Sequence, residues 1–282
     1  MLPALLVTAV AVACGGGSKK EAPRAAAGAG GGGAAGTSAA GEPGSGTSGD
    51  LGASAGHAGA SAGRAGSGGA SAGAGAAGGS SYATSFDLTE APISENGVWH
   101  HAGLDWTFVD TEGGIAFGTQ VLGMNRSGPG AYNDSYAYLS GFAADQRASA
   151  VVHQGTIDPG CTHEVEILLR WSDADHVAQG YECNLAYDGS YAQIVRWNGP
   201  VGDFTYLGSG SVPGGVHDGD TLAASITGTR ITLSVNGVVT ATADDASYAT
   251  GNPGIGFWRG DGGCGALGDY GFTSFVASDA PP

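Results

Sequence analysis

Apolar and polar positions alternate between residues 164 and 197, and this alternation is the clearest pattern in the chain. In residues 164–171 the side chains fall into two sets, Val165, Ile167, Leu169 and Trp171 on one face and Glu164, Glu166, Leu168 and Arg170 on the other. A period of two is typical of a β-strand with one buried face. Residues 181–187 and 191–197 continue the pattern on either side of an Asp188-Gly189 turn signal. The pattern predicts consecutive antiparallel strands.

Shorter runs of the same kind continue on both sides of this core. They cover residues 104–108, 115–117, 136–139, 148–153, 204–207, 222–227, 231–235, 238–242, 255–258 and 271–276. Asn236-Gly237, between two of these runs, is a strong signal for a two-residue hairpin. No run longer than ten residues in this region shows the apolar period of a helix. Some ten to fourteen short strands at regular spacing predict an all-β fold, a two-sheet antiparallel jelly-roll sandwich.

The start of the chain does not share this pattern. Residues 2–13 are almost wholly apolar, but twelve residues are too few to span a bilayer, which takes about twenty. The run resembles the apolar part of a signal peptide, and Ala11-Val12-Ala13-Cys14 resembles a bacterial lipobox. The resemblance implies a signal peptide at 1–13, lipidation of Cys14 and export, with Gly15 after the cysteine favouring the outer membrane and cell surface. The alternative is an ordinary secretory signal followed by an incidental cysteine.

Residues 14–81 consist mainly of glycine, alanine and serine. The sequence G-A-S-A-G occurs at 52–56, 59–63 and 69–73. Each copy matches the G-x-S-x-G pattern of serine hydrolases, but none follows a predicted strand, so we assign no nucleophile there. A stretch with so few bulky apolar side chains cannot offset its ordering entropy, which predicts a disordered low-complexity linker. Residues 82–282 then form one domain with a sizeable core.

This predicted domain is strongly acidic. All but three of the 26 acidic residues of the chain lie in residues 82–282, against six arginines and no lysine, so its formal net charge is −17. Such a surface repels nucleic acid and anionic lipid headgroups, and we exclude both as partners. The only predicted contact with a membrane is through the lipid anchor.

Several motifs in this region resemble a known family. They are N-D-S-Y-A at 133–137, L-R-W-S-D-A-D at 169–175, G-T-R-I-T-L-S-V-N-G at 228–237 and D-A-S-Y-A-T-G-N-P-G at 245–254, together with Tyr181 and Arg196. They resemble the concanavalin A-like lectin/glucanase superfamily, in its laminin-G-like and 3-keto-disaccharide hydrolase-like branches. The resemblance covers nearly all of residues 82–278 and implies the jelly-roll fold. It implies no single activity, because the superfamily includes sugar binders, hydrolases, lyases and spacer domains.

Two acidic residues on one predicted strand are the candidate catalytic groups. Glu164 and Glu166 project from the same face, and a carboxylate pair can serve as nucleophile and general acid/base in glycoside hydrolysis. Family 16 glycoside hydrolases carry E-x-D-x-x-E on such a strand, and here Leu169 stands in place of the third acid. The alternative is a solvated strand face on which Arg170 screens the acids.

Aromatic and basic residues are the candidate ligand-binding groups. A sugar site places Trp or Tyr rings against pyranose rings and adds a few polar groups for the hydroxyls. Trp99, Tyr187, Trp258 and Arg259 fall in or beside predicted loops, and Arg170 completes the set. The alternative for each aromatic ring is core packing, which we expect for Trp106 and Trp171.

No metal site or cofactor is required by the sequence. Calcium is plausible for the superfamily, and oxygen donors in predicted loops could hold it, although they form no EF-hand pattern: Asp244, Asp245, Asn252, Asp261 and Asp269.

Export favours a disulfide among the three remaining cysteines, Cys161, Cys183 and Cys264. In a hairpin of residues 164–171 and 181–187, Cys161 and Cys183 would lie a strand length apart, on the order of 20 Å. A disulfide joins Cα atoms less than about 7 Å apart. We therefore expect Cys264 to pair with Cys161 or Cys183.

Three functions remain open at this point. The first is a lipoprotein with a lectin-like domain that binds a polysaccharide or oligosaccharide. The second is a glycoside hydrolase that uses the face of Glu164 and Glu166. The third is a structural or adhesive surface domain without a sugar site.

Overall fold

Fifteen strands and one short 3-10 helix make up the regular structure of the residues that the computed structural model describes. These are residues 79–101, 107–119, 134–156, 162–200, 202–259 and 265–279, and all belong to one compact unit within residues 63–282. The predictions for the signal peptide, Cys14, the linker as far as residue 78, Trp106, Cys161, Asp261 and Cys264 lie outside them, whereas Ser81, predicted as the last linker residue, begins a strand. No helix in the described ranges is long and apolar enough to cross a membrane.

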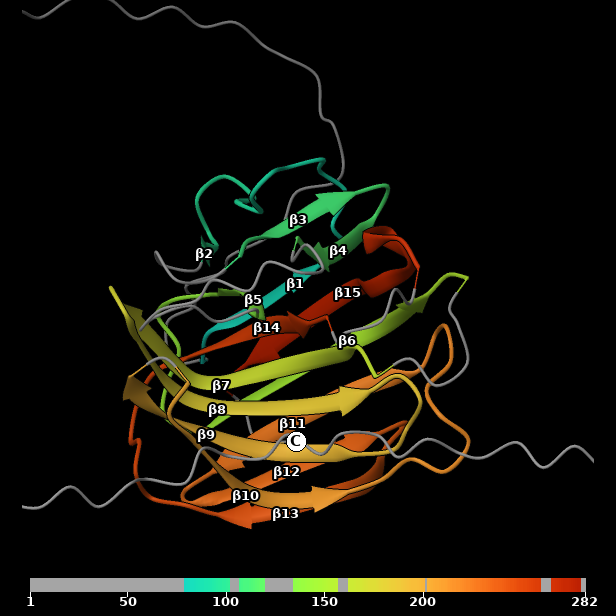
Figure 1. Ribbon diagram of the computed structural model, residues 1–282. Helices are drawn as coiled ribbons and strands as arrows, with labels where there is room; N and C mark the ends of the chain where they lie inside the picture. Colours follow the sequence, from blue (N-terminus) through green and yellow to red (C-terminus); the bar gives the residue numbers. More distant parts are fainter. Residues whose placement is uncertain are drawn as a thin grey trace, which may run out of the picture. The chain divides into compact units, whose positions relative to one another are not determined.

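The strands form two antiparallel sheets. The eight-stranded sheet has the order β13 (Val238–Asp244), β12 (Arg230–Val235), β11 (Thr221–Thr227), β6 (Gln146–Gln154), β15 (Tyr270–Ser278), β4 (Ile115–Gly118), β3 (Val109–Glu112), with β1 (Ser81–Thr84) also paired to β15. The seven-stranded sheet has the order β10 (Phe204–Gly210), β9 (Ala192–Pro200), β8 (Val177–Ala186), β7 (Glu164–Ala174), β14 (Asn252–Trp258), β5 (Asp134–Tyr138), β2 (His100–His101). The 3-10 helix spans Leu267–Asp269 just before β15. The predicted two-sheet sandwich is confirmed (Figure 1).

Alternation predicted most of these strands. The hairpin of β12 and β13 turns at Asn236 and Gly237, which have φ angles of 50° and 77°. Two positive φ angles in succession are what a type I′ turn needs, so the Asn-Gly signal is confirmed. The short strands β1, β2 and β3 carry little apolar periodicity and were not predicted.

The main core lies between the sheets. It combines buried side chains of both, including Val165, Ile167 and Leu169 from β7 and Ile226 and Leu233 from the sheet opposite. Figure 1 shows the long strands β7, β8 and β9 side by side in front of β11 and β12. The predicted inward face of β7 is therefore correct as far as Leu169.

A bulge after Leu169 changes the face of the residues that follow. The pairing of β7 with β8 shifts register between Leu169 and Ser172, and Arg170 has a φ of 47°. An extra residue in one strand moves the next side chain to the opposite side of the sheet. Trp171 is buried as predicted, but in a second cluster with Leu168, Val195 and Trp197 rather than between the sheets.

Candidate functional site

The second cluster lies on the face of the seven-stranded sheet that points away from the other sheet, which we call the outer face. Its members come from strands of the seven-stranded sheet alone. Strand register and alternation place on this face Asp134, Tyr136 and Tyr138 of β5, Gly254, Gly256 and Trp258 of β14, Glu164, Glu166, Leu168 and Trp171 of β7, Glu182 and Asn184 of β8, Tyr191 just before β9, and Val195 and Trp197 of β9.

Aromatic rings cover much of the outer face. Trp171 contacts Tyr136 and Trp197 edge-on, with ring centroids 5.2 and 6.2 Å apart, and Trp197 contacts Phe204 at 5.4 Å. Edge-to-face pairs of this kind add packing energy beyond the area that they bury. The prediction of a solvated face for Glu164 and Glu166 is therefore wrong, since their exposed fractions are 6% and 2%.

A polar network runs beneath these rings. The Asn184 Nδ2 donates to Glu182 Oε1 at 2.6 Å and to Glu164 Oε2 at 2.9 Å. Trp197 Nε1 donates to the other oxygen of Glu182 at 2.6 Å, and the Tyr191 hydroxyl donates to Glu164 Oε1 at 2.5 Å. Burial and the Glu164 carboxylate raise the pKa of Tyr191 far above its ordinary value. The carboxylates are thus held in fixed positions by neutral donors.

Three carboxylates meet at the centre of the outer face. Ligand oxygens of Asp134, Glu166 and Glu182 all lie within 4.8 Å of one another, and all three residues are buried. Glu166 reaches this position because its neighbour on β14 is Gly256, where an added Cβ would lie only 2.1 Å from the Glu166 carboxylate. The acid pair predicted on β7 thus belongs to a larger group contributed by β5, β7 and β8.

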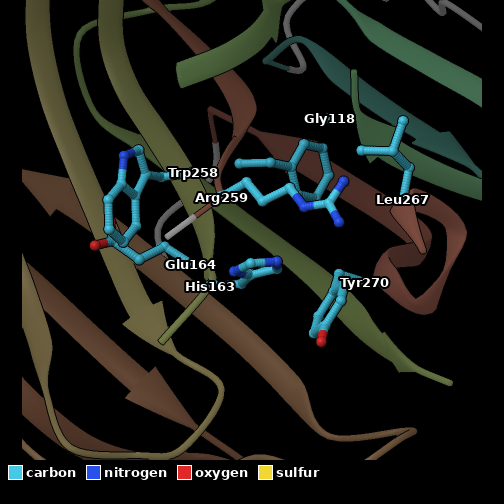
Figure 2. Close-up of a pocket in the computed structure, with 8 residues that line it drawn as sticks. Gly118, His163, Glu164, Trp258, Arg259, Leu267 and Tyr270 are labelled. Atoms are coloured by element: carbon cyan, nitrogen blue, oxygen red, sulfur yellow. The ribbon is translucent and has the colours of Figure 1, made fainter. Parts of the chain in front are cut away.

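A small pocket lies at the end of the sandwich where Trp258 pairs with Glu164 across β14 and β7, and both sheets contribute to its lining. It is lined by Gly118, His163, Glu164, Phe257, Trp258, Arg259, Leu267 and Tyr270. In Figure 2, the side chain of Arg259 extends over the imidazole of His163, and Tyr270 lies beyond that imidazole. Trp258 and Glu164 occupy the opposite side. Trp258 and Arg259 are both half-buried, so each keeps some surface for a ligand.

The imidazole in this pocket is neutral at ordinary pH. His163 is 2% exposed, and its ring lies 4.4 Å from that of Tyr270. Burial, together with the positive charge of Arg259, lowers the pKa of His163 to about 4. The pocket therefore presents one cation, Arg259, and one carboxylate, Glu164, on either side of an uncharged ring.

Two of the five predicted ligand-binding residues come together in this pocket, Trp258 and Arg259, and they join the predicted acid Glu164. Trp99 does not, because it is 4% exposed and its Nε1 donates to Tyr82 and Glu95 inside the core. Tyr187 is 1% exposed, and its hydroxyl donates to the carbonyl of His153. For these two rings the core alternative was right.

Arg170 is the third predicted ligand-binding residue that does not line the pocket. The bulge turns its side chain away from the acids, and it is 4% exposed. Its guanidinium donates to three carbonyl oxygens, those of Ala144, Tyr248 and Gly228, at 2.7, 2.8 and 2.9 Å. Arg170 therefore joins three loops and does not screen the carboxylates of β7.

The predicted calcium donors that the structure describes are not brought together; Asp261 is not among them. Asp244 pairs with Arg230 and Asp245 with Arg196, each at 2.6 Å. Asp269 accepts from the backbone of Ala266 near the 3-10 helix. Within the described ranges, the group of three or more side chains spaced to hold a metal ion is Asp134, Glu166 and Glu182.

Cys183 is a buried free thiol in the middle of β8, opposite Ile167. Of the two disulfide pairings left open by the sequence, the one with Cys183 is therefore excluded. Burial raises the pKa of this thiol far above its ordinary value, with a smaller contribution from Glu182. Cys161 and Cys264, the remaining pair, lie outside the described residues.

Sequence reasoning missed Asp134, Glu182, Asn184 and Tyr191. A usable signal existed for two of them, because Glu182 and Asn184 alternate with Tyr181, Cys183 and Leu185 in one predicted strand. That alternation already assigned them to the face opposite the core. Asp134 required knowledge of which strands neighbour β14, and a single sequence does not supply that.

Comparison with known proteins gives similarities in structure alone. No protein-family model and no curated protein matches the chain. Among solved structures, it is similar to the carbohydrate-binding module CBM66 from Bacillus subtilis, at 16% identity and a TM-score of 0.44, covering 66% of this chain and 96% of that one. It is also similar to the potassium-bound carbohydrate recognition domain of Emp46p, at 11% identity and a TM-score of 0.45, covering 67% and 91%.

A third similar structure is the kappa-carrageenase from Pseudoalteromonas carrageenovora in complex with an oligotetrasaccharide of kappa-carrageenan. The identity is 10%, the TM-score is 0.41, and the match covers 70% of this chain and 90% of that one. The solved structures thus include carbohydrate-binding modules, lectin domains and glycoside hydrolases of the concanavalin A-like kind. Identities and TM-scores this low do not indicate which activity, if any, this chain shares with them.

Proposed function

We propose that the domain binds a polysaccharide or oligosaccharide at the pocket end of the outer face. The observation that carries the proposal is the half-buried Trp258, which lies beside the carboxylate of Glu164 and lines the same pocket as the guanidinium of Arg259 (Figure 2). The C–H face of a pyranose packs on an indole, while its hydroxyls need donors and acceptors beside the ring. The net charge of −17 favours a neutral glycan over a polyanionic one.

A glycan array probed with the full chain, with and without a chelator, tests this proposal. Glycans bound by the wild type are then titrated against Trp258→Ala, for which we expect at least a tenfold loss of affinity. The matched control is Val238→Ala, which removes an exposed apolar side chain from the other sheet. No binding to any glycan, or equal binding by the Trp258 variant, would count against this site.

We also propose that the domain is displayed at the cell surface by a lipid on Cys14. Support comes from the sequence, where the lipobox-like Ala11–Cys14 segment precedes a Gly/Ala/Ser-rich stretch. The variant Cys14→Ser should move from the membrane fraction to the soluble fraction. Retention of that variant in the membrane fraction would refute the anchor.

A second candidate function is glycoside hydrolysis, which one observation favours. Glu164 is a buried carboxylate held by the Tyr191 hydroxyl and the Asn184 amide, and it lines the same pocket as Trp258. Fixed, desolvated carboxylates are what such chemistry requires. Reducing-end release from β-glucans by the wild type and by Glu164→Gln distinguishes the functions, because equal rates in the two proteins would exclude catalysis by Glu164.

A further inference from the structure

Four oxygen-bearing side chains meet on the outer face, next to the pocket in which Trp258 lies. Asp134 comes from β5, Glu166 from β7, and Glu182 and Asn184 from β8, with Glu166 and Asn184 directly opposite each other in the strand register. All four are at most 5% exposed. We propose that these side chains form a calcium site.

The spacing of the oxygens fits a calcium ion. Ligand atoms of Asp134, Glu166 and Glu182 lie within 4.8 Å of one another. Calcium binds oxygens at about 2.3–2.6 Å, so two ligands on opposite sides of one ion are about 4.6–5.2 Å apart. Magnesium demands near-ideal octahedral geometry and usually keeps several waters, whereas a group of carboxylates from three strands is a ligand set that calcium accepts. The group therefore needs little rearrangement to hold calcium.

Asn184 provides an independent indication of a missing ligand. It is 3% exposed, and its Oδ1 has no hydrogen-bond partner. Its Nδ2 is fixed between Glu182 and Glu164, so the amide cannot rotate freely to satisfy that oxygen. A buried amide oxygen without a partner is costly. Asn184 is bonded to Glu182, one of the three acids, and an amide carbonyl oxygen is a normal calcium ligand.

The backbone is shaped to bring the acids together. The carboxylate of Glu166 occupies the space that a side chain at position 256 would fill, and Gly256 leaves that space empty. Glu166 can therefore lie across β14 towards Asp134 on β5. The Trp197 indole donates to Glu182 and holds the third acid in place.

Charge also favours a cation at this point. Three carboxylates within 4.8 Å repel one another, and burial removes most of the water that would screen them. A divalent cation coordinated by all three offsets the repulsion and supplies the partner that the Asn184 oxygen lacks.

Terbium luminescence tests the proposal in the full chain. Tb³⁺ occupies calcium sites, and the indole of Trp197, bonded to Glu182, is close enough to sensitise its emission. We expect saturable emission on excitation of tryptophan, competed by Ca²⁺ at concentrations at least tenfold lower than by Mg²⁺. Glu166→Gln should weaken Tb³⁺ binding at least tenfold. The control Asp244→Asn alters an exposed carboxylate of the other sheet and should bind as the wild type does.

Two results would overturn the proposal. One is a wild type with no saturable emission and no rise of its unfolding midpoint in millimolar Ca²⁺. The other is emission that Glu166→Gln leaves unchanged. If circular dichroism shows that Glu166→Gln is unfolded, Gly256→Ala, which displaces the same carboxylate, replaces it. The titration uses no sugar. Terbium binding can therefore be found when no glycan binds, and a glycan can bind when terbium does not.

Discussion

Replacing Arg170 by methionine should destabilise the domain strongly, although the residue lies on a strand that begins with the candidate acids. The guanidinium is bonded to the carbonyls of Ala144, Tyr248 and Gly228. At about 1–1.5 kcal/mol net for each bond, the three contribute about 3–4.5 kcal/mol. Methionine keeps the packing of the aliphatic stem, and the exposed Gly228 can bond to water instead. We therefore expect a loss of about 2–4 kcal/mol.

Urea unfolding followed by tryptophan fluorescence measures this loss. For a domain of this size, each kcal/mol lowers the melting temperature by about 2–4 °C, so the variant should melt roughly 5–15 °C lower. The control is Arg230→Met, because the ion pair of Arg230 with Asp244 leaves side-chain exposures of 52% and 61%. An exposed pair contributes at most about 1 kcal/mol. If Arg170→Met lost no more stability than Arg230→Met, the structural role of Arg170 would be refuted.

Three further predictions concern buried groups. Trp99→Phe removes both hydrogen bonds of the indole and should cost about 1–2 kcal/mol in urea unfolding while leaving glycan affinity unchanged; weaker glycan binding would restore Trp99 to the site. The pKa of His163 is about 4, below the value of about 6.5 in an unfolded chain, so its contribution to stability is complete above about pH 6.5 and is lost as the pH falls towards 4. Urea midpoints across that range should fall less in His163→Gln than in the wild type, and parallel curves would contradict this. Cys183 should resist iodoacetamide in the native protein and react after unfolding, as peptide mass mapping can show.

The fold could be predicted from the sequence because its cause is local. Alternation in β7, β8, β11 and β12 marks which side chains enter the core, and Asn236-Gly237 fixes one hairpin. The bulge at Arg170 could not be predicted, because nothing in the sequence marks a positive φ at an arginine. Because the bulge was not foreseen, unbroken alternation predicted the wrong face for Trp171 and placed Arg170 beside the acids as a screening charge.

The site was predicted less completely, because it depends on which strands are neighbours. Glu164 and Glu166 were found from one strand, and Trp258 from its position at the end of another. Their relation became visible only when β14 was placed beside β7. Periodicity also cannot tell a solvated face from one that aromatic rings cover, which explains the error about the burial of the two acids.

The pairing of β1 with β15 bears on how this domain can be presented. Ser81 lies opposite Ser278, so the chain enters and leaves the sandwich through adjoining strands of the eight-stranded sheet. Candidate binding groups occupy the other layer. Anything fused to either end is therefore joined at the eight-stranded sheet. A recombinant display or tandem array built through these ends should leave the outer face of the seven-stranded sheet accessible.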